Sequence, residues 1–204
     1  MTDSIMYHEG NRRMQDVFGS RPMADRLEDK QTRTAFNDAD RELIENAIYF
    51  FIATADTEGH PDCSYKGGAP GFVRVVGPDE LAFPDYDGNG MFKSIGNMLV
   101  NPNVGLLFIG LHEKPLRLRI NGVASFSLED SLMSSTVGAQ LIVRVKARAI
   151  FPNCPRNVHK MQLIKLSKYV PLPGSEPLEP KWKDQFKDVR HPRQPTFKGD
   201  ANEG

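Results

Sequence analysis

Short runs in which apolar and polar residues alternate recur through the middle of the 204-residue chain. In residues 116–121, leucine and isoleucine alternate with arginine and asparagine, and residues 141–148 alternate leucine and valine with arginine and lysine. Successive side chains of a strand point to opposite faces of a sheet, so this pattern predicts antiparallel strands with one packed face. The middle of the chain is therefore expected to fold mainly as β structure.

Further strands are expected where β-branched and aromatic residues cluster between turn residues. These runs are 47–55, 71–76, 80–84 and 104–109. The turn 56–61 predicts a hairpin partner directly after it. Helices are expected over 37–44, which begins with capping residues, and over 91–100, which ends before Pro102. Six or seven strands with few helices favour a barrel or a sandwich, and a Rossmann sheet is not expected.

Composition divides the chain into three parts. Residues 1–37 are charged and are predicted to form an N-terminal arm that packs on something else, such as a second subunit. Residues 38–170 form the β domain, and residues 171–204 form a polar, Pro-rich tail. The only tryptophan, Trp182, is expected to anchor this tail, and its last dozen residues are expected to be disordered.

Charge and cysteine content exclude several functions. The 26 basic residues balance the 26 acidic ones, which argues against a nucleic-acid partner. Two cysteines are too few for a disulfide framework, and the scattered histidines and cysteines give no metal-ligand spacing. No segment reaches the roughly 18 apolar residues of a membrane span, so no membrane partner is expected. These features predict a protein of the reducing cytoplasm without a metal.

Two segments combine residue types that bind anions. Residues 64–71 join a serine, Lys66 and three glycines, and glycines let backbone N–H groups approach an anion closely. Residues 83–94 leave a strand, pass two glycines and enter a helix whose first turn holds Lys93 and Ser94. A helix start offers free N–H groups and the positive end of the dipole. The alternatives are a flexible hairpin loop and a plain strand-to-helix connection capped by Asn89.

Three arginines are further candidates for an anion. Arg117 and Arg119 share the polar face of one expected strand, where they can bind phosphate or only cover a solvated sheet face. Arg156 follows Pro155 after the last strand and is a candidate contact to an anion or substrate.

Several runs, taken in order, resemble the FMN-binding split β-barrel of the pyridoxamine 5'-phosphate oxidase-like superfamily, in an uncharacterised branch. The runs that carry the resemblance are Phe50–Ala55, Gly59–Pro61, Leu81–Asn89, Ser94–Phe108 and Leu116–Gly122. The resemblance implies an antiparallel, Greek-key split β-barrel with a few flanking helices, in a homodimer with FMN at the subunit interface. Arg117 would then reach the flavin from the other subunit.

The two anion-binding segments fall in the site that the resemblance implies. The predicted cofactor-binding residues are Ser64, Tyr65, Lys66, Gly67, Phe83, Asp85, Tyr86, Asn89, Met91, Lys93, Ser94, Asn97, Arg117 and Arg156.

The expected function is that of an FMN-dependent oxidoreductase, a flavoprotein that transfers a hydride through flavin N5. The donor would be NAD(P)H or an organic molecule, the substrate is a small molecule that the sequence does not identify, and no residue is assigned as catalytic. The vitamin-metabolising oxidases carry a C-terminal Arg-Leu-His-Asp-Arg-like stretch, of which residues 189–193 are a faint echo, so pyridoxamine-phosphate oxidation itself is not expected. The alternative is a non-enzymatic split-barrel dimer that holds flavin or haem for storage or sensing, with His60 or His159 as the haem ligand.

Overall fold

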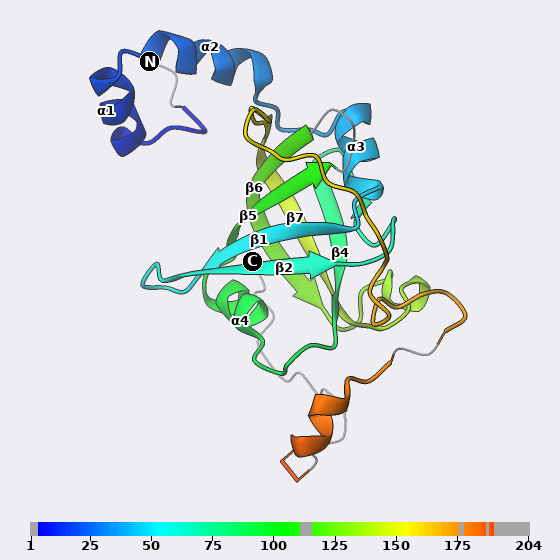
Figure 1. The fold of residues 1–204 in the computed structure, drawn as a ribbon. Helices are drawn as coiled ribbons and strands as arrows, with labels where there is room; N and C mark the ends of the chain where they lie inside the picture. The colour runs from blue at the N-terminus through cyan, green and yellow to red at the C-terminus, as the bar shows by residue number, and fades with distance from the viewer. Residues whose placement is uncertain (1–3, 111–115, 176–177, 187, 190–204) are drawn as a thin grey trace.

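The computed structural model describes residues 4–110, 116–175, 178–186 and 188–189. Its main element is a seven-stranded antiparallel sheet that curls around one core (Figure 1). The strands are β1 (Tyr49–Ala55), β2 (Pro61–Gly67), β3 (Arg74–Val75), β4 (Glu80–Tyr86), β5 (Asn103–Gly110), β6 (Leu116–Ser127) and β7 (Ala139–Pro152). The predicted antiparallel split β-barrel is thus confirmed.

The barrel is split because the two end strands of the sheet do not pair with each other. The strand order is β2-β1-β5-β6-β7-β4-β3, so β2 lies at one edge and β3, beside β4, at the other. The hairpin predicted after residues 56–61 is β1–β2, with Tyr49 opposite Gly67 and Ala55 opposite Pro61. The split therefore leaves the polar strand β2 facing β4 without a backbone ladder between them.

The core is filled by aromatic and branched side chains from the inner faces of the strands. Phe50 is fully buried and contacts three other rings, with ring centroids 4.9 Å from Phe83, 5.1 Å from Phe108 and 5.9 Å from Phe72. Aromatic contacts of this kind add to the free energy gained from burying their area. This packing joins β1 to β4 and β5 across the core.

Helices flank the barrel without entering the sheet. They are α1 (Glu9–Val17), α2 (Arg21–Gln31), α3 (Asp38–Glu45) and α4 (Lys93–Val100), with short 3-10 turns η1 (Met133–Ser135) and η2 (Lys181–Phe186). The predicted cap of α3 is present, because Asn37 accepts the backbone N–H of Asp40 and Asp40 accepts that of Asn37. None of the described helices combines the length and the hydrophobicity of a membrane-spanning segment.

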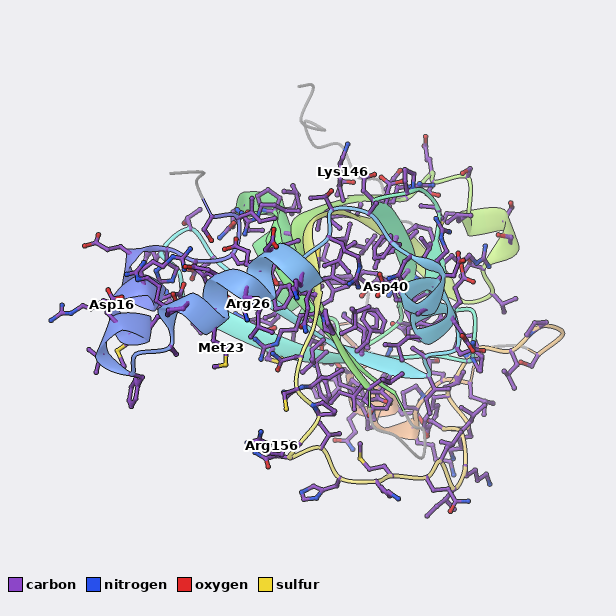
Figure 2. All side chains as sticks on the ribbon, turned by 90° about the horizontal axis from the view of Figure 1, so that it is seen from above. Asp16, Met23, Arg26, Asp40, Lys146 and Arg156 are labelled. Atoms are coloured by element: carbon purple, nitrogen blue, oxygen red, sulfur yellow. The ribbon has the colours of Figure 1, made fainter. Side chains whose placement is uncertain are left out.

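The N-terminal arm consists of α1 and α2, which stand away from the barrel (Figures 1 and 2). None of the nine residues of α1 is buried. The two helices are joined by the ion pair between Arg12 and Asp25 at 2.5 Å, and Ser4, which precedes α1, donates to Glu28 of α2 at 2.7 Å. After α2 the chain meets the barrel through a bridge between Arg33 and Ile150.

Two predicted elements and the predicted burial of one residue differ from the structure. The run 71–76 is reduced to the two-residue β3, because Gly71 takes a positive φ of 85° and only Arg74 and Val75 pair with β4. The helix expected from residue 91 begins at Lys93, since residue 92 is left-handed. Leu116, expected on the packed face, is 48% exposed because it lies at the outer end of β6.

Candidate functional site

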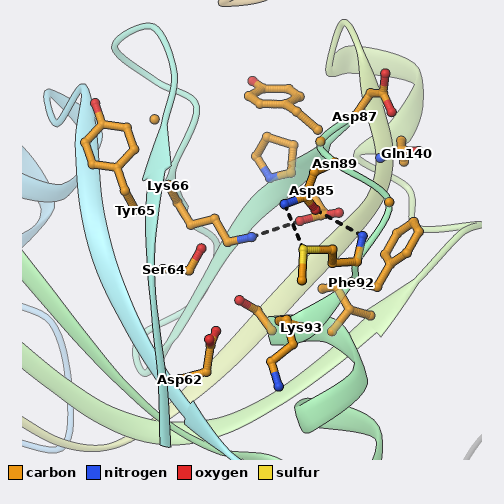
Figure 3. Close-up of a pocket in the computed structure, with 18 of the residues that line it drawn as sticks. Asp62, Ser64, Tyr65, Lys66, Asp85, Asp87, Asn89, Phe92, Lys93 and Gln140 are labelled. Carbon is orange, nitrogen blue, oxygen red and sulfur yellow. Dashed lines mark hydrogen bonds and ion pairs between the residues drawn. The ribbon is translucent and has the colours of Figure 1, made fainter. Parts of the chain in front are cut away.

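A cavity of about 1210 Å³ opens in the split, between β2 and β4 (Figure 3). Its walls come from β2, from the end of β4, from the loop 87–92, from the first turn of α4 and from the start of β7. Ligand sites in proteins are concavities of this order of size that combine apolar walls with a few polar groups. The cavity is therefore the candidate functional site.

One ion pair crosses the split inside this cavity. Lys66 on β2 reaches to Asp85 on β4, with 3.1 Å between Nζ and Oδ1 (Figure 3). The two side chains are only 19% and 10% exposed. Alternation along β2 places Ser64 on the same side as Lys66, whereas Tyr65 lies on the opposite face of the strand and stacks on Tyr49 with ring centroids 5.5 Å apart. The pair thus joins two strands that share no backbone hydrogen bond.

The loop between β4 and α4 brings the start of α4 to the cavity. Asn89 accepts the backbone N–H of Met91 at 3.0 Å, and Gly90 has a φ of 77°. Phe92, the residue before the helix, has a φ of 48°, an uncommon conformation for a residue with a side chain. Strained residues of this kind often lie at ligand-binding sites.

The first turn of α4 has hydrogen-bonding capacity that the chain does not use. No side chain caps the helix, and the backbone N–H groups of Lys93 and Ser94 have no acceptor among the described residues. Ser94 is 5% exposed, and its hydroxyl likewise has no hydrogen-bond partner among the described residues. Because free N–H groups and the helix dipole both favour negative charge, this turn is suited to an anion.

Tyr86 supplies a hydroxyl donor at the end of β4. Burial raises the pKa of its phenol, and the positive charge of Arg74 offsets part of that rise. The phenol therefore stays protonated at neutral pH and can donate a hydrogen bond into the cavity.

The charges that line the cavity are nearly balanced. The amines are Lys66 and Lys93, and the carboxylates are Asp62, Asp85 and Asp87. Asp87 forms an ion pair with a lysine of the C-terminal segment, Lys183, which lies outside the lining set. Lys93 has no ion-pair partner among the described residues, so its charge is available to a bound anion.

Most of the predicted site residues line the cavity. Those that do are Ser64, Tyr65, Lys66, Gly67, Asp85, Tyr86, Asn89, Met91, Lys93 and Ser94. They come from two segments that the sequence keeps apart and that the split brings together.

Four predicted residues lie elsewhere. Phe83 is 1% exposed and packs in the core against Phe50. Asn97 is buried and donates to the Thr54 hydroxyl at 3.0 Å, which ties α4 to β1. Arg117 donates to the carbonyl of Cys154, and Arg156 is exposed on the segment after β7 (Figure 2).

Sequence reasoning missed several lining residues. The missed polar residues are Asp62, Cys63, Asp87 and Gln140. Asp62 could have been predicted from strand alternation, because it shares a face of β2 with Ser64 and Lys66. Gln140 had no such signal, since it reaches the site only because the start of β7 pairs with the end of β4.

The model of one protein family, described as pyridoxamine 5'-phosphate oxidase, matches residues 36–166, well over half of the chain. The chain belongs to the pyridoxamine 5'-phosphate oxidase family. Both cavity-lining segments, 62–67 and 84–95, lie inside the matched region, whereas Lys183 lies beyond it. No curated protein sequence matches the chain significantly.

Solved structures that are similar to the chain are distant from it. HupZ of Group A Streptococcus is 18% identical, with 57% of this chain and 93% of HupZ covered and a TM-score of 0.46. An FMN-binding protein of Syntrophomonas wolfei is 13% identical, with 69% and 97% covered and a TM-score of 0.45. HutZ, a haem-storage protein of Vibrio cholerae, is 16% identical, with 58% and 95% covered and a TM-score of 0.43. These similarities are too distant to assign a ligand to this member of the pyridoxamine 5'-phosphate oxidase family.

Proposed function

We propose that the protein binds FMN in the split between β2 and β4 and acts as an FMN-dependent oxidoreductase. Membership of the pyridoxamine 5'-phosphate oxidase family supports this assignment. The observation that carries it is the first turn of α4, where the buried Ser94 hydroxyl and two free backbone N–H groups open on the cavity. A phosphate monoester satisfies all of these donors at once.

The residues present fit the parts of FMN. Lys93, Ser94 and the start of α4 would hold the phosphate. Tyr86 and Asn89 can hydrogen-bond ribityl hydroxyls, and Lys66 can place a positive charge beside the polar edge of the ring system. When bound, the flavin would supply hydride transfer at N5, and the protein would supply orientation and a fixed electrostatic environment. We propose NAD(P)H as the hydride donor.

A histidine-ligated haem is the weaker candidate for this cavity. His60 lies in the β1–β2 turn, where its Nδ1 is 3.0 Å from Asp56, and it is exposed. His159 is also exposed, on the segment after β7. Neither residue is in the lining set of the cavity.

We also propose that the protein is a homodimer in the cytoplasm. The arm leaves large apolar side chains exposed, which a monomer in water has no means of covering. The exposed apolar residues of the arm are Met14, Val17, Phe18, Met23 and Leu27. Both cysteines are free, which suits a reducing compartment. Sedimentation equilibrium should give twice the chain mass of 22.9 kDa, and a particle of 22.9 kDa would contradict the dimer.

The visible spectrum of the purified protein tests the cofactor. We expect the two-banded absorbance of an oxidised flavin after incubation with FMN and desalting. A single intense Soret band after exposure to haem, with no flavin retained, would contradict the proposal. Anaerobic addition of NADH or NADPH should bleach the flavin bands. If neither nucleotide bleaches them, the protein binds FMN but is not a nicotinamide-dependent reductase.

A further inference from the structure

A buried lysine near the C-terminal end of the chain contacts the rim of the cavity. Lys183 lies in η2 and is 7% exposed, and its amine forms an ion pair with Asp87, 96 residues earlier in the chain. Asp87 is the first residue of the loop 87–92, which leads to α4 (Figure 3). Figure 1 places η2 below this loop. The segment that contains η2 is therefore joined to the part of the site that presents the anion-binding turn.

The burial of Lys183 distinguishes its contact with Asp87 from an ordinary surface ion pair. Lysine is almost never buried unless it is paired, because removing its charge from water is costly. Two residues earlier, Lys181 is exposed and has no ion-pair partner among the described residues. The tryptophan expected to anchor the tail is 44% exposed and packs edge-on against Phe186, with ring centroids 6.1 Å apart. The anchor of this segment is thus Lys183 and not Trp182.

The pair also changes the charge at the mouth of the cavity. Lys183 adds a third amine beside the two amines and three carboxylates of the lining. A phosphate dianion entering the cavity therefore meets one more positive charge at the rim than the lining alone supplies, and opposite charges at short range attract. With Lys183 in place, Asp87 is neutralised by a partner that comes from outside the matched family region.

We propose that residues 180–186 are a C-terminal latch on the cavity and that Lys183 is its positioning residue. Through Asp87, Lys183 fixes the loop 87–92 and neutralises the rim, so that the latch slows the loss of a phosphate-bearing ligand. The effect on FMN rests on the function proposed above, whereas the docking of the latch does not.

Trp182 reports docking without any ligand, because it is the only tryptophan of the chain and adjoins Lys183. Acrylamide quenching of its fluorescence should rise up to about twofold in Lys183→Ala, because a six-residue 3-10 helix released from the barrel unfolds, loses the contact between Trp182 and Phe186, and takes the indole from 44% to full exposure. Asp87→Asn should give the same rise, and the double variant no more than either single one. Lys181→Ala should leave quenching unchanged. Equal quenching in the wild type, Lys183→Ala and Asp87→Asn would overturn the latch.

Ligand dissociation tests the second part of the proposal. FMN should dissociate several-fold faster from Lys183→Ala than from Lys181→Ala, and riboflavin, which has no phosphate, should show a smaller difference. Equal dissociation rates of FMN from the two variants would contradict the claim that the latch slows the loss of the ligand. If the wild-type protein binds no FMN, the proposed function and this role of the latch fail together, while Trp182 quenching still decides whether the segment docks.

Discussion

Breaking the ion pair between Lys66 and Asp85 should destabilise the barrel, because the pair closes the split where no strand ladder exists. At 3.1 Å and an effective dielectric constant of 20, the direct attraction is about 5 kcal/mol. Desolvation offsets part of it. Removing one partner of a fully buried pair costs about 3–5 kcal/mol, and of an exposed pair about 0–1 kcal/mol. With side chains 19% and 10% exposed, Asp85→Asn should cost about 2–3 kcal/mol.

Urea unfolding monitored by circular dichroism measures this cost. For a slope of about 2 kcal/mol per molar urea, the midpoint of Asp85→Asn should fall by about 1 M. The double variant Lys66→Met/Asp85→Leu should be less destabilised than the sum of its single variants, because neither charge is left unpaired. Asp16→Asn is the matched control. It removes an ion pair of the arm with Arg21 whose contact is 2.5 Å but whose side chains are exposed, and it should not move the midpoint. An unchanged midpoint in Asp85→Asn would refute the idea that the pair closes the split.

Three further changes have definite expected outcomes. Ser94→Ala should weaken FMN binding by about tenfold or more, the value of a charge-assisted hydrogen bond, and leave riboflavin binding unchanged in a fluorescence titration; an equal loss for both would place the phosphate elsewhere. Hydrogen bonds from Arg144 lower the pKa of Asp130, so the ionised carboxylate stabilises the folded protein. This stabilisation is complete above pH 3.8, the ordinary pKa of the group, and is lost as the pH falls through the lowered pKa. The free energy of unfolding should therefore fall more steeply below pH 3.8 in the wild type than in Asp130→Asn, and parallel pH profiles would count against this. Gly122→Ala should lower the melting temperature, because a Cβ there would lie 2.3 Å from the Lys146 carbonyl oxygen, at a cost of about 1–3 kcal/mol; Gly96→Ala, with no atom within 4 Å, is its control.

Strand positions were predictable where one face of the strand is buried and the other is not. Along β6, Leu118 and Ile120 are buried while Arg119 is exposed, so the alternation in the sequence corresponds directly to the sheet. Strand β4 behaves differently, because its five central residues are all buried. Alternation then carries no information, and for this reason Phe83, in the core, and Asp85, in the cavity, could not be told apart from the sequence.

The candidate site was predictable as two segments but not as a set of contacts. Glycines and a lysine in 64–71, and the helix start at Lys93, are local signals that a sequence contains. The pairing of Lys66 with Asp85 depends on how the sheet curls, which no local pattern specifies. The same holds for the pair of Lys183 with Asp87, since 96 residues separate its members.

The tail and the arm show the limits of composition as a guide. A polar, Pro-rich segment favours disorder, and the disorder predicted for the last dozen residues lies outside the described part of the chain, as do residues 190–193 of the stretch 189–193. Within that part, η2 forms and its buried Lys183 forms an ion pair with Asp87, a contact that composition does not predict. For the arm, composition predicts a packing surface, and the structure adds which apolar side chains are exposed on it.

The affinity of the flavin-free wild-type protein for FMN and for riboflavin tests the central claim most directly. The two ligands share the ring system and the ribityl chain and differ only in the phosphate that we place at the start of α4. Titration calorimetry of both should show FMN binding at least about tenfold more tightly, the difference that one charge-assisted hydrogen bond provides. Equal affinities, or no binding of either ligand, would contradict the account of the split barrel as a flavin site.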